Sequence, residues 1–226
     1  MTDAHQHTVT LARLSSGAIV LLSVGYVGTG LVWLVLHESM VAERGLQPHE
    51  PYLTILEAIM VLVNIPVVIL FAALYVDAPV TRKVYAAAGF AFVIAMVTIT
   101  GLVHFIELFV IRRTSNEVIR SAFEFYGPDG KLTPMFGADM LAWDLLFGLA
   151  LLFSGASMAR EAGVIRVGFF VCGLLCLAGC LFPITGDSRL QMPAILGYAI
   201  GFPIVCIFLF RWFGRSHAMT LVADGG

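Results

Sequence analysis

Six long apolar runs constrain this chain more than any other feature of its sequence. They cover roughly residues 15–37, 52–76, 84–111, 139–159, 164–184 and 191–213. A helix needs about 20 apolar residues to cross the ~30 Å hydrocarbon core of a bilayer. Only 12% of the 226 residues are charged, about half the share found in soluble proteins. The sequence therefore predicts an all-α integral membrane protein, a bundle of six transmembrane helices.

The flanking segments define a simple domain organisation. We expect a polar N-terminal tail at 1–14, one transmembrane domain at 15–213 and a C-terminal tail at 214–226. The N-terminus lacks the positive segment and cleavage site of a signal peptide, which predicts that the first span is retained. Six spans place both tails on one side. Arg44 and Arg189 are the single cations of the two short outer segments, which favours cytoplasmic tails, at the inner membrane if the source is bacterial.

The long connection between the third and fourth spans has a pattern of its own. Thr114 and Glu117 have the spacing of a capping box. Apolar residues then recur at helical spacing, which predicts an amphipathic helix over 115–126 on the membrane surface. "GPDG" at 127–130 ends it as a turn. The connection is either a packing element or a lid over a cavity.

Small residues recur on the last two spans at the spacing of helix contacts. Gly168, Cys172, Cys176 and Cys180 are each four residues apart, and Gly197 and Gly201 form a GxxxG motif. Such ridges allow membrane helices to approach closely. We expect helix packing here rather than a disulfide framework that includes Cys206 or a thiolate metal site.

Acidic residues and histidines of the spans gather at one level of the predicted bundle. Consecutive spans alternate in direction, so position along a span gives the side of the membrane, and inverting the protein keeps the group together. An ionisable side chain inside a span indicates a functional site, because burying its charge is unfavourable. Glu38, Asp139 and Asp187 are also compatible with the headgroup region. The level is shared by His37, Glu38, Glu57, His104, Glu107, Asp139, Asp144, Asp187 and Gln191.

Helical spacing divides these residues into faces. Thr100, His104 and Glu107 share one face of the third span, and Glu57 and Asn64 share a face of the second. Trp33 and Trp143 fit either a site or an aromatic belt at the interface. The candidate catalytic residues are His104, Glu107, Glu57 and Asp144. The candidate substrate-binding residues are Tyr26, Trp33, His37, Asn64, Thr100, Trp143 and Tyr198.

This inventory favours an acid/base enzyme that acts on a lipophilic, isoprenoid-like or sterol-like substrate without a cofactor. A carboxylic acid in a low-dielectric pocket can stay protonated near neutral pH and protonate an alkene or epoxide. A second acid or an imidazole can remove a proton elsewhere, which gives isomerisation or cyclisation. Aromatic faces stabilise an intervening carbocation. Glu107, tuned by His104, is the favoured acid, with Glu57 or Asp144 as base or second acid.

The segment "GLVHFIELF" at 101–109 resembles the G-x-x-H-x-x-x-E stretch of the emopamil-binding-protein family of sterol isomerases. The charged connector with Phe125 and Tyr126, and the acid in "MLAWDLLFG", continue the resemblance. It implies that His104, Glu107 and Asp144 occupy catalytic positions for a carbocation-type double-bond shift. The chain departs from the family in the three-residue spacing of His104 and Glu107 and in its six predicted spans. Its last span also has a tryptophan only near its end.

Two other classes of function remain open from the residues alone. A one-sided cavity with acids could bind a cationic ligand or the substrate of a proton-coupled transporter. His37, His104 and Glu107 or Asp144 could bind a catalytic metal, and His37 with His104 could hold a haem. The expected partners are membrane lipids and a lipophilic small molecule, with a homodimer also open. No basic tract for nucleic acid exists.

Overall fold

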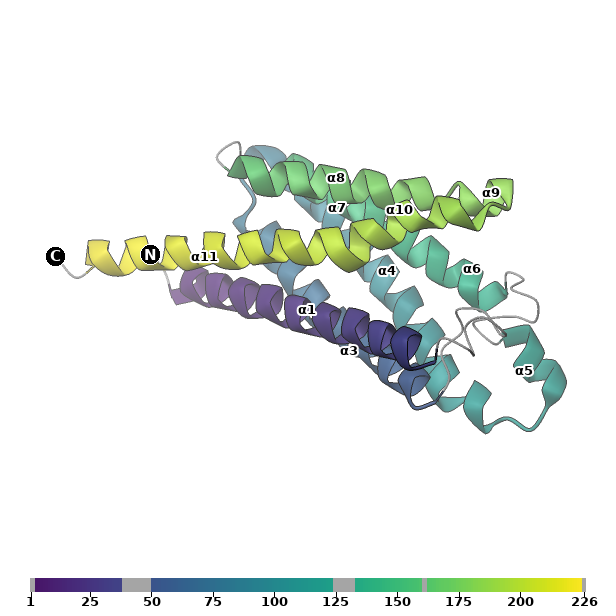
Figure 1. Ribbon diagram of the computed structural model, residues 1–226. Helices are drawn as coiled ribbons and strands as arrows, with labels where there is room; N and C mark the ends of the chain where they lie inside the picture. Colours follow the sequence, from purple (N-terminus) through teal and green to yellow (C-terminus); the bar gives the residue numbers. More distant parts are fainter. Residues whose placement is uncertain (1–2, 38–49, 124–132, 160–161, 225–226) are drawn as a thin grey trace.

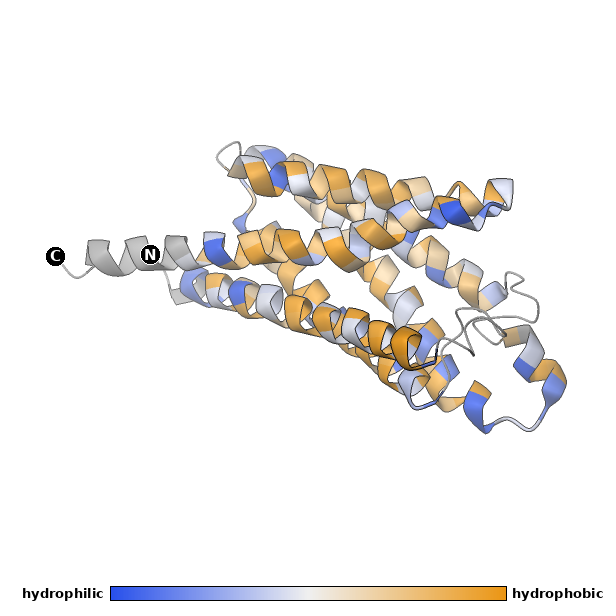
Figure 2. Cartoon of the chain, viewed as in Figure 1, coloured by the Kyte–Doolittle hydropathy of each residue, from blue (hydrophilic) through white to orange (hydrophobic). Residues whose placement is uncertain are grey.

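The computed structural model describes residues 3–37, 50–123, 133–159 and 162–224, and all regular secondary structure within these ranges is helical. The described residues include six helical segments long and apolar enough to span a membrane, which confirms that prediction. Hydrophobic residues dominate along their length and hydrophilic residues gather toward the ends (Figure 2). The six segments are His5–Leu36, Tyr52–Asp77, Val80–Arg113, Pro134–Ser157, Gly163–Thr185 and Ser188–Gly214.

Three of the spans are built around single α-helices and three are composite; Figure 1 shows their arrangement. The single helices are α1 (Asp3–Leu36), α3 (Tyr52–Asp77) and α4 (Lys83–Phe109), with the short 3₁₀ turns η1 (Val80–Arg82) and η2 (Ile111–Arg113) flanking α4. The fourth span joins α6 (Pro134–Met140), the π-helix η4 (Leu141–Leu146) and α7 (Phe147–Ser157). The fifth joins α8 (Gly163–Gly179) and α9 (Phe182–Thr185). The sixth joins η6 (Ser188–Gln191), α10 (Met192–Ile195), the π-helix η7 (Leu196–Gly201) and α11 (Phe202–Asp224).

Helical backbone continues beyond the predicted first and last spans. Helix α1 already begins at Asp3, and α11 continues to Asp224, so helical backbone extends into both segments expected as tails. Polar residues there, such as Gln6 and Thr10, continue the helix as an exposed turn, with the Thr10 hydroxyl donating to the Gln6 carbonyl. A helix can therefore extend well beyond its apolar run, which is the part that hydropathy detects.

The spans form a closed ring in chain order. Each packs against its neighbour in sequence, α1 with α3, α3 with α4, α4 with α7, and α7 with α8. Helix α11 contacts both α8 and α1, which closes the ring. Helix α1 begins and α11 ends at the same end of the bundle, which we call the terminal end (Figure 1). This arrangement is what an even number of spans requires.

Four phenylalanines from four helices fill the middle of the ring. Phe71 of α3 lies 6.2 Å, between ring centroids, from each of Phe147, Phe169 and Phe202. Phe147 and Phe202 meet edge-to-face at 4.9 Å. Aromatic rings favour such edge and tilted arrangements over face-to-face stacking. We call Phe71, Phe147, Phe169 and Phe202 the aromatic core; all four are buried.

The small-residue ridges lie at the α8 contact with the last span. A Cβ added to Gly201 would lie 2.7 Å from Cys172 Sγ, and one added to Gly197 would lie 3.0 Å from the Cys172 carbonyl oxygen. Glycines of η7 therefore pack directly on the cysteine ridge of α8. All four cysteines are free. This is close helix packing of the kind that membrane bundles use.

The connection after α4 begins with a capping motif other than the one expected. Asn116 Oδ1 accepts hydrogen bonds from the backbone N–H groups of Val118 (3.0 Å) and Ile119 (3.3 Å), so Asn116 caps α5 (Glu117–Phe123). The predicted capping box of Thr114 and Glu117 is therefore wrong by two residues. Both side chains are good caps, but Thr114 Oγ1 instead accepts from the N–H of Asn116. The aromatic pair at 125–126 and the GPDG turn at 127–130 lie outside the described residues.

Candidate functional site

A cavity of about 470 Å³ occupies the half of the bundle away from the terminal end. Its walls come from α1, α3, α4, α6, η4 and the start of the last span. Most of the lining surface is apolar, and polar groups contribute the smaller share, as is typical of small-molecule sites. The residues that line it are Leu22, Ser23, Tyr26, Leu53, Leu56, Glu57, Ile59, Met60, Val63, His104, Phe136, Asp139, Trp143, Ser188, Arg189, Gln191, Met192, Ile195, Tyr198 and Ala199.

A buried carboxyl–imidazole–carboxyl triad lies on one wall. Glu57 Oε2 lies 2.5 Å from His104 Nδ1, and Asp139 Oδ1 lies 3.3 Å from His104 Nε2. Glu57 and His104 are almost completely buried, and the Asp139 side chain is 15% exposed. One imidazole therefore lies between two carboxyl groups from two other helices, hydrogen-bonded to Glu57 and at ion-pair distance, without hydrogen-bond geometry, from Asp139. Charged or protonated, such a buried group is stable only when its partners are held in good geometry.

Local sequence explains how the three side chains meet. Thr133 caps α6 by accepting a hydrogen bond from the N–H of Phe136 (3.1 Å), and Pro134 follows at the first helical position, where its fixed φ suits a helix start. This cap places Asp139 on the second turn of α6. Arg112, after α4, forms an ion pair with Glu50 at 2.8 Å and a hydrogen bond with Thr54. These contacts join the start of α3 to the end of α4, and so hold Glu57 beside His104.

Two π-helices form the floor of the cavity. Trp143 belongs to η4 and Tyr198 to η7, and their rings lie 5.1 Å apart between centroids. Trp143 also contacts Phe147 edge-to-face at 5.4 Å, which connects the floor to the aromatic core. π-Helical turns are rare and occur frequently at functional sites. Hydrophobic periodicity does not predict them, so these two elements could not be found from the sequence.

The structure brings five of the eleven predicted site residues to the cavity: Glu57, His104, Tyr26, Trp143 and Tyr198. It adds Asp139, which the sequence also allowed in the headgroup region. The signal that could have identified Asp139 is its place one helical turn before Trp143, with Thr133 as a cap that begins the helix earlier than the apolar run.

Glu107, the favoured acid, does not line the cavity. It is buried on the same face of α4 as His104, one turn further toward the end of the helix. Residues that share one face of a helix can still contact different neighbouring helices. Glu57 and Asp139, rather than Glu107, are therefore the carboxyl groups that line the cavity beside His104.

Asp144 follows Trp143 on η4, is buried, and is not among the residues that line the cavity. A Cβ added to Gly179 of α8 would lie 2.5 Å from Asp144 Oδ2, so this glycine makes room for the carboxyl group. Neither carboxyl oxygen has a hydrogen-bond partner in the described part of the chain. Asp144 is therefore an internal group at the contact of the fourth span with α8 rather than part of the cavity wall.

Four predicted binding residues lie elsewhere. Asn64 packs toward α4, since a Cβ added to Gly101 would lie 3.5 Å from Asn64 Nδ2. Thr100 and Trp33 are buried but are not part of the cavity lining. The His37 ring meets Tyr52 edge-to-face at 5.5 Å, at the start of α3. Glu38 lies outside the described residues.

The described residues contain no group of three His, Cys, Asp or Glu side chains arranged to hold a metal ion. His37 contacts the Tyr52 ring and is not among the residues that line the cavity with His104. The predicted three-ligand metal sets, His37 and His104 with Glu107 or Asp144, are therefore not assembled in this part of the chain. The pairing of His37 with His104 for a haem stays a prediction.

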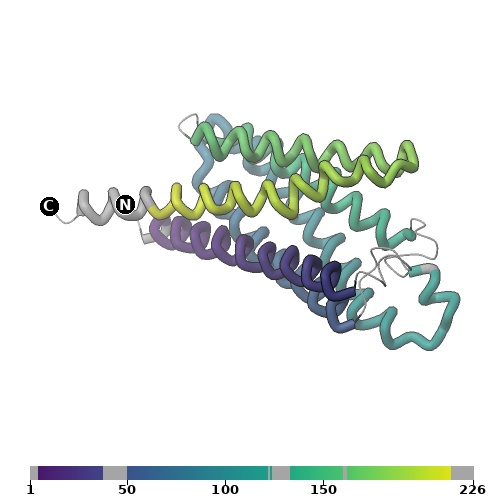
Figure 3. The backbone as a smooth tube through the Cα atoms, viewed as in Figure 1, coloured from purple at the N-terminus to yellow at the C-terminus, as the bar shows by residue number. Residues whose placement is uncertain are grey.

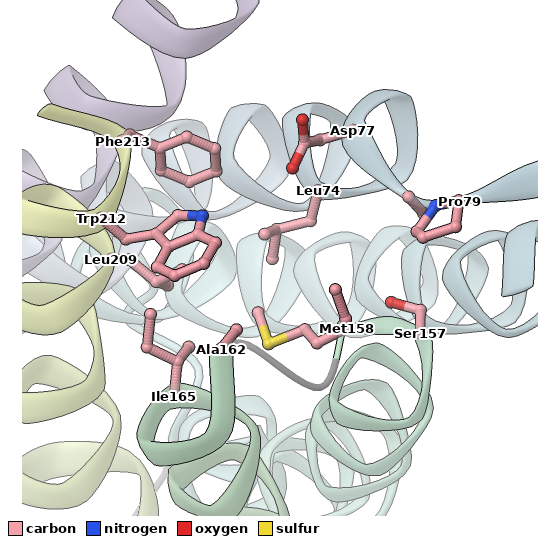
Figure 4. A pocket seen from close by; sticks show the side chains of 12 residues that line it. Leu74, Asp77, Pro79, Ser157, Met158, Ala162, Ile165, Leu209, Trp212 and Phe213 are labelled. Carbon is pink, nitrogen blue, oxygen red and sulfur yellow. The ribbon is translucent and has the colours of Figure 1, made fainter. Parts of the chain in front are cut away.

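A second, smaller cavity of about 90 Å³ lies at the terminal end (Figure 4). Trp212 and Phe213 of α11, Leu74 of α3 and Met158 after α7 surround it, and Asp77 is its single charged group. It is smaller than the roughly 150 Å³ apolar cavity that accommodates benzene. The aromatic core lies in the ring between the two cavities.

Comparisons of this chain with protein-family models, with curated proteins and with solved structures found no match.

Proposed function

We propose that this protein is a membrane-embedded acid/base enzyme that shifts a double bond in a lipophilic, isoprenoid-like substrate. The observation that carries the proposal is the Glu57–His104–Asp139 triad on the wall of an otherwise largely apolar cavity. Ionisable groups inside membrane spans indicate function, and a triad that only joined helices would not need a ligand-sized cavity beside it. The cavity position therefore distinguishes this triad from a structural ion pair.

The triad can complete a double-bond shift without net consumption of protons. Asp139, as the acid, donates a proton to one alkene carbon, and the π electrons form the new C–H bond. Glu57, as the carboxylate, removes a proton from the carbon next to the resulting cation, and that C–H pair becomes the new double bond. His104 contacts both carboxyl groups and returns the proton from Glu57 to Asp139. A cyclase would share the first of these steps.

The floor of the cavity suits a cationic intermediate. Trp143 and Tyr198 present aromatic rings beside the triad, and Tyr26 lies on the α1 side. The faces of such rings attract positive charge, more strongly when water is excluded. An apolar lining also limits capture of the cation by water.

A transporter is the second candidate, and the aromatic core argues against it. Transport requires a polar route to the other side of the membrane, and Phe147 and Phe202 meet directly beneath Trp143 and Tyr198. The rings are buried and tightly packed. A cavity closed at its inner end favours chemistry on a substrate that enters and leaves by the same side.

The surroundings of the cavity support a membrane location for the reaction. Helix α5 contacts α6 at the cavity end of the bundle and exposes Val118 (76%) and Phe123 (44%). Arg120 lies on the same short helix. We propose that α5 lies at the headgroup level, with its apolar side chains in the interface.

The reaction can be tested by deuterium incorporation. Purified protein in nanodiscs is incubated in D₂O with a mixture of terpenoid alkenes, and products are analysed by mass spectrometry. We expect an isomer that carries one deuterium from the solvent, because the partly exposed Asp139 carboxyl group exchanges its proton with the solvent between turnovers. Asp139→Asn should lower its rate by about 10²- to 10⁴-fold, the usual contribution of a general acid.

Asp77→Asn is the matched control, since it removes an acid at the opposite end of the bundle. It should retain the wild-type rate. Recovery of every alkene without deuterium would contradict the enzyme, and accumulation of an unchanged compound inside proteoliposomes would favour the transporter. Full turnover by Asp139→Asn would remove Asp139 from the mechanism.

A further inference from the structure

The cavity has a polar mouth that the proposed chemistry does not use. Ser188, Arg189 and Gln191 of η6 line it at the end of the bundle, beyond the apolar body of the site. Arg189 is the single lysine or arginine among the lining residues. The described residues form no ion pair with Arg189, whereas the two carboxyl groups of the cavity already share His104.

The backbone that carries Arg189 is held in place locally. Gly186 ends α9 with φ of 76°, a left-handed conformation that glycine adopts without strain. Asp187 Oδ1 then accepts a hydrogen bond from the Arg189 N–H at 3.0 Å and caps η6. The position of the arginine at the mouth is therefore defined by the turn, while its side chain stays exposed.

The cavity is lined by α1 on one side and by the start of the last span on the other. Near the terminal end these helices touch, since a Cβ on Gly17 would lie 3.6 Å from Phe210 and Arg13 lies 4.5 Å from the Phe210 ring centroid. Toward the other end they diverge (Figure 3). There the cavity is lined by Ser23 of α1 and Ala199 of η7, both only partly buried. We call the space between these two partly exposed residues the lateral gap.

The volume limits the ligand. A cavity of about 150 Å³ accommodates benzene, so one of about 470 Å³ accommodates on the order of 18 non-hydrogen atoms by proportion. A complete sterol exceeds that size. A linear or branched chain with its polar head outside the mouth fits it.

We infer that the site takes a single-chain amphiphile that carries an anionic head group, with Arg189 binding the head and the chain entering between α1 and η7. The inference rests on the proposed function, because it names the substrate class of the same cavity. A guanidinium group binds phosphate or carboxylate oxygens through paired N–H donors. A substrate dissolved in the bilayer would have its chain at the level of the lateral gap and its charged head group at the level of η6.

Binding of three matched probes tests this inference. Hexadecyl phosphate, hexadecanol and hexadecylammonium share one chain and differ in head-group charge. Dissociation constants are measured by native mass spectrometry from a non-ionic detergent. We expect wild-type protein to bind the phosphate at least tenfold more tightly than the alcohol, on the order of the contribution of a charge-assisted pair. Arg189→Gln should remove that preference, and Arg113→Gln, at the same end but outside the cavity, should keep it.

Equal affinity for phosphate and alcohol in the wild type, a preference for the ammonium, or a preference that survives Arg189→Gln would each overturn the inference. Ala199→Trp, and Ser23→Trp from the other side of the gap, should weaken all three probes by narrowing the opening. If Arg189→Gln has no effect but both tryptophan variants do, the head-group assignment fails and the cavity proposal stands. Binding that neither tryptophan variant weakens contradicts both the head-group assignment and the cavity proposal. So does the absence of binding by all three probes.

Discussion

Replacing His104 by alanine is expected to abolish turnover and to lower the free energy of unfolding by about 3 kcal/mol. His104 is the shared partner of Glu57 and Asp139, at 2.5 Å and 3.3 Å. Its removal leaves two buried carboxyl groups without the imidazole ring that lies between them and contacts each. Breaking a buried pair by removing one partner is strongly unfavourable, because the remaining group keeps its desolvation penalty.

The stability of the variant is measured by reversible unfolding in detergent, and its turnover by the deuterium assay. His37→Ala is the control, since it removes the other histidine at this end, which contacts the Tyr52 ring, and it should change turnover little. A His104→Ala protein with wild-type stability would mean that the contacts of His104 with Glu57 and Asp139 do not stabilise the fold. A variant with wild-type turnover would refute the proton-return role of His104.

Replacing Gly173 by alanine is expected to destabilise the bundle by about 2 kcal/mol. A Cβ at this position would lie 2.9 Å from the Gly148 carbonyl oxygen and 2.8 Å from Leu152 Cδ2. The backbone of α7 cannot move aside locally, so α7 and α8 must separate. Because α7 continues from η4, the separation should also disturb Trp143 and weaken ligand binding.

Gly28→Ala provides the matched control. A Cβ added to Gly28 would meet no atom within 4 Å, and alanine is favoured over glycine inside a helix by roughly 0.5–1 kcal/mol. Unfolding of the two variants under identical conditions should therefore shift in opposite directions. If Gly173→Ala is as stable as the wild type, the close approach of α7 and α8 is not a requirement of the fold.

The spans could be predicted from the sequence for a physical reason. Crossing a bilayer requires a long apolar run, and composition reports that directly. The spans over 52–76 and 84–111 correspond closely to Tyr52–Asp77 and Val80–Arg113. Cap selection failed at α5 because Thr114 and Asn116 are both competent caps, and the hydrogen bonds alone distinguish them.

The candidate site could be predicted in part. Alternation of the spans placed Glu57, His104 and Asp139 at one level, but it could not tell which of several acids reaches the imidazole. Glu107 shares a face of its own helix with His104. The carboxyl groups that line the cavity beside the His104 ring are nevertheless Glu57 and Asp139, which come from other helices. The rotation of one helix against another decides such pairings, and that rotation depends on side-chain packing over the whole ring.

By itself, therefore, the sequence determined the all-helical class, the six helices apolar enough to span a membrane, and the gathering of acids and histidines at one end. The tertiary structure alone decided that His104 joins Glu57 to Asp139, that two π-helices turn Trp143 and Tyr198 into the cavity floor, and that Arg189 stands at the mouth. Hydropathy is a property of each segment and can be read locally. The rotation and register of packed helices are properties of all six together, and only their mutual packing fixes them.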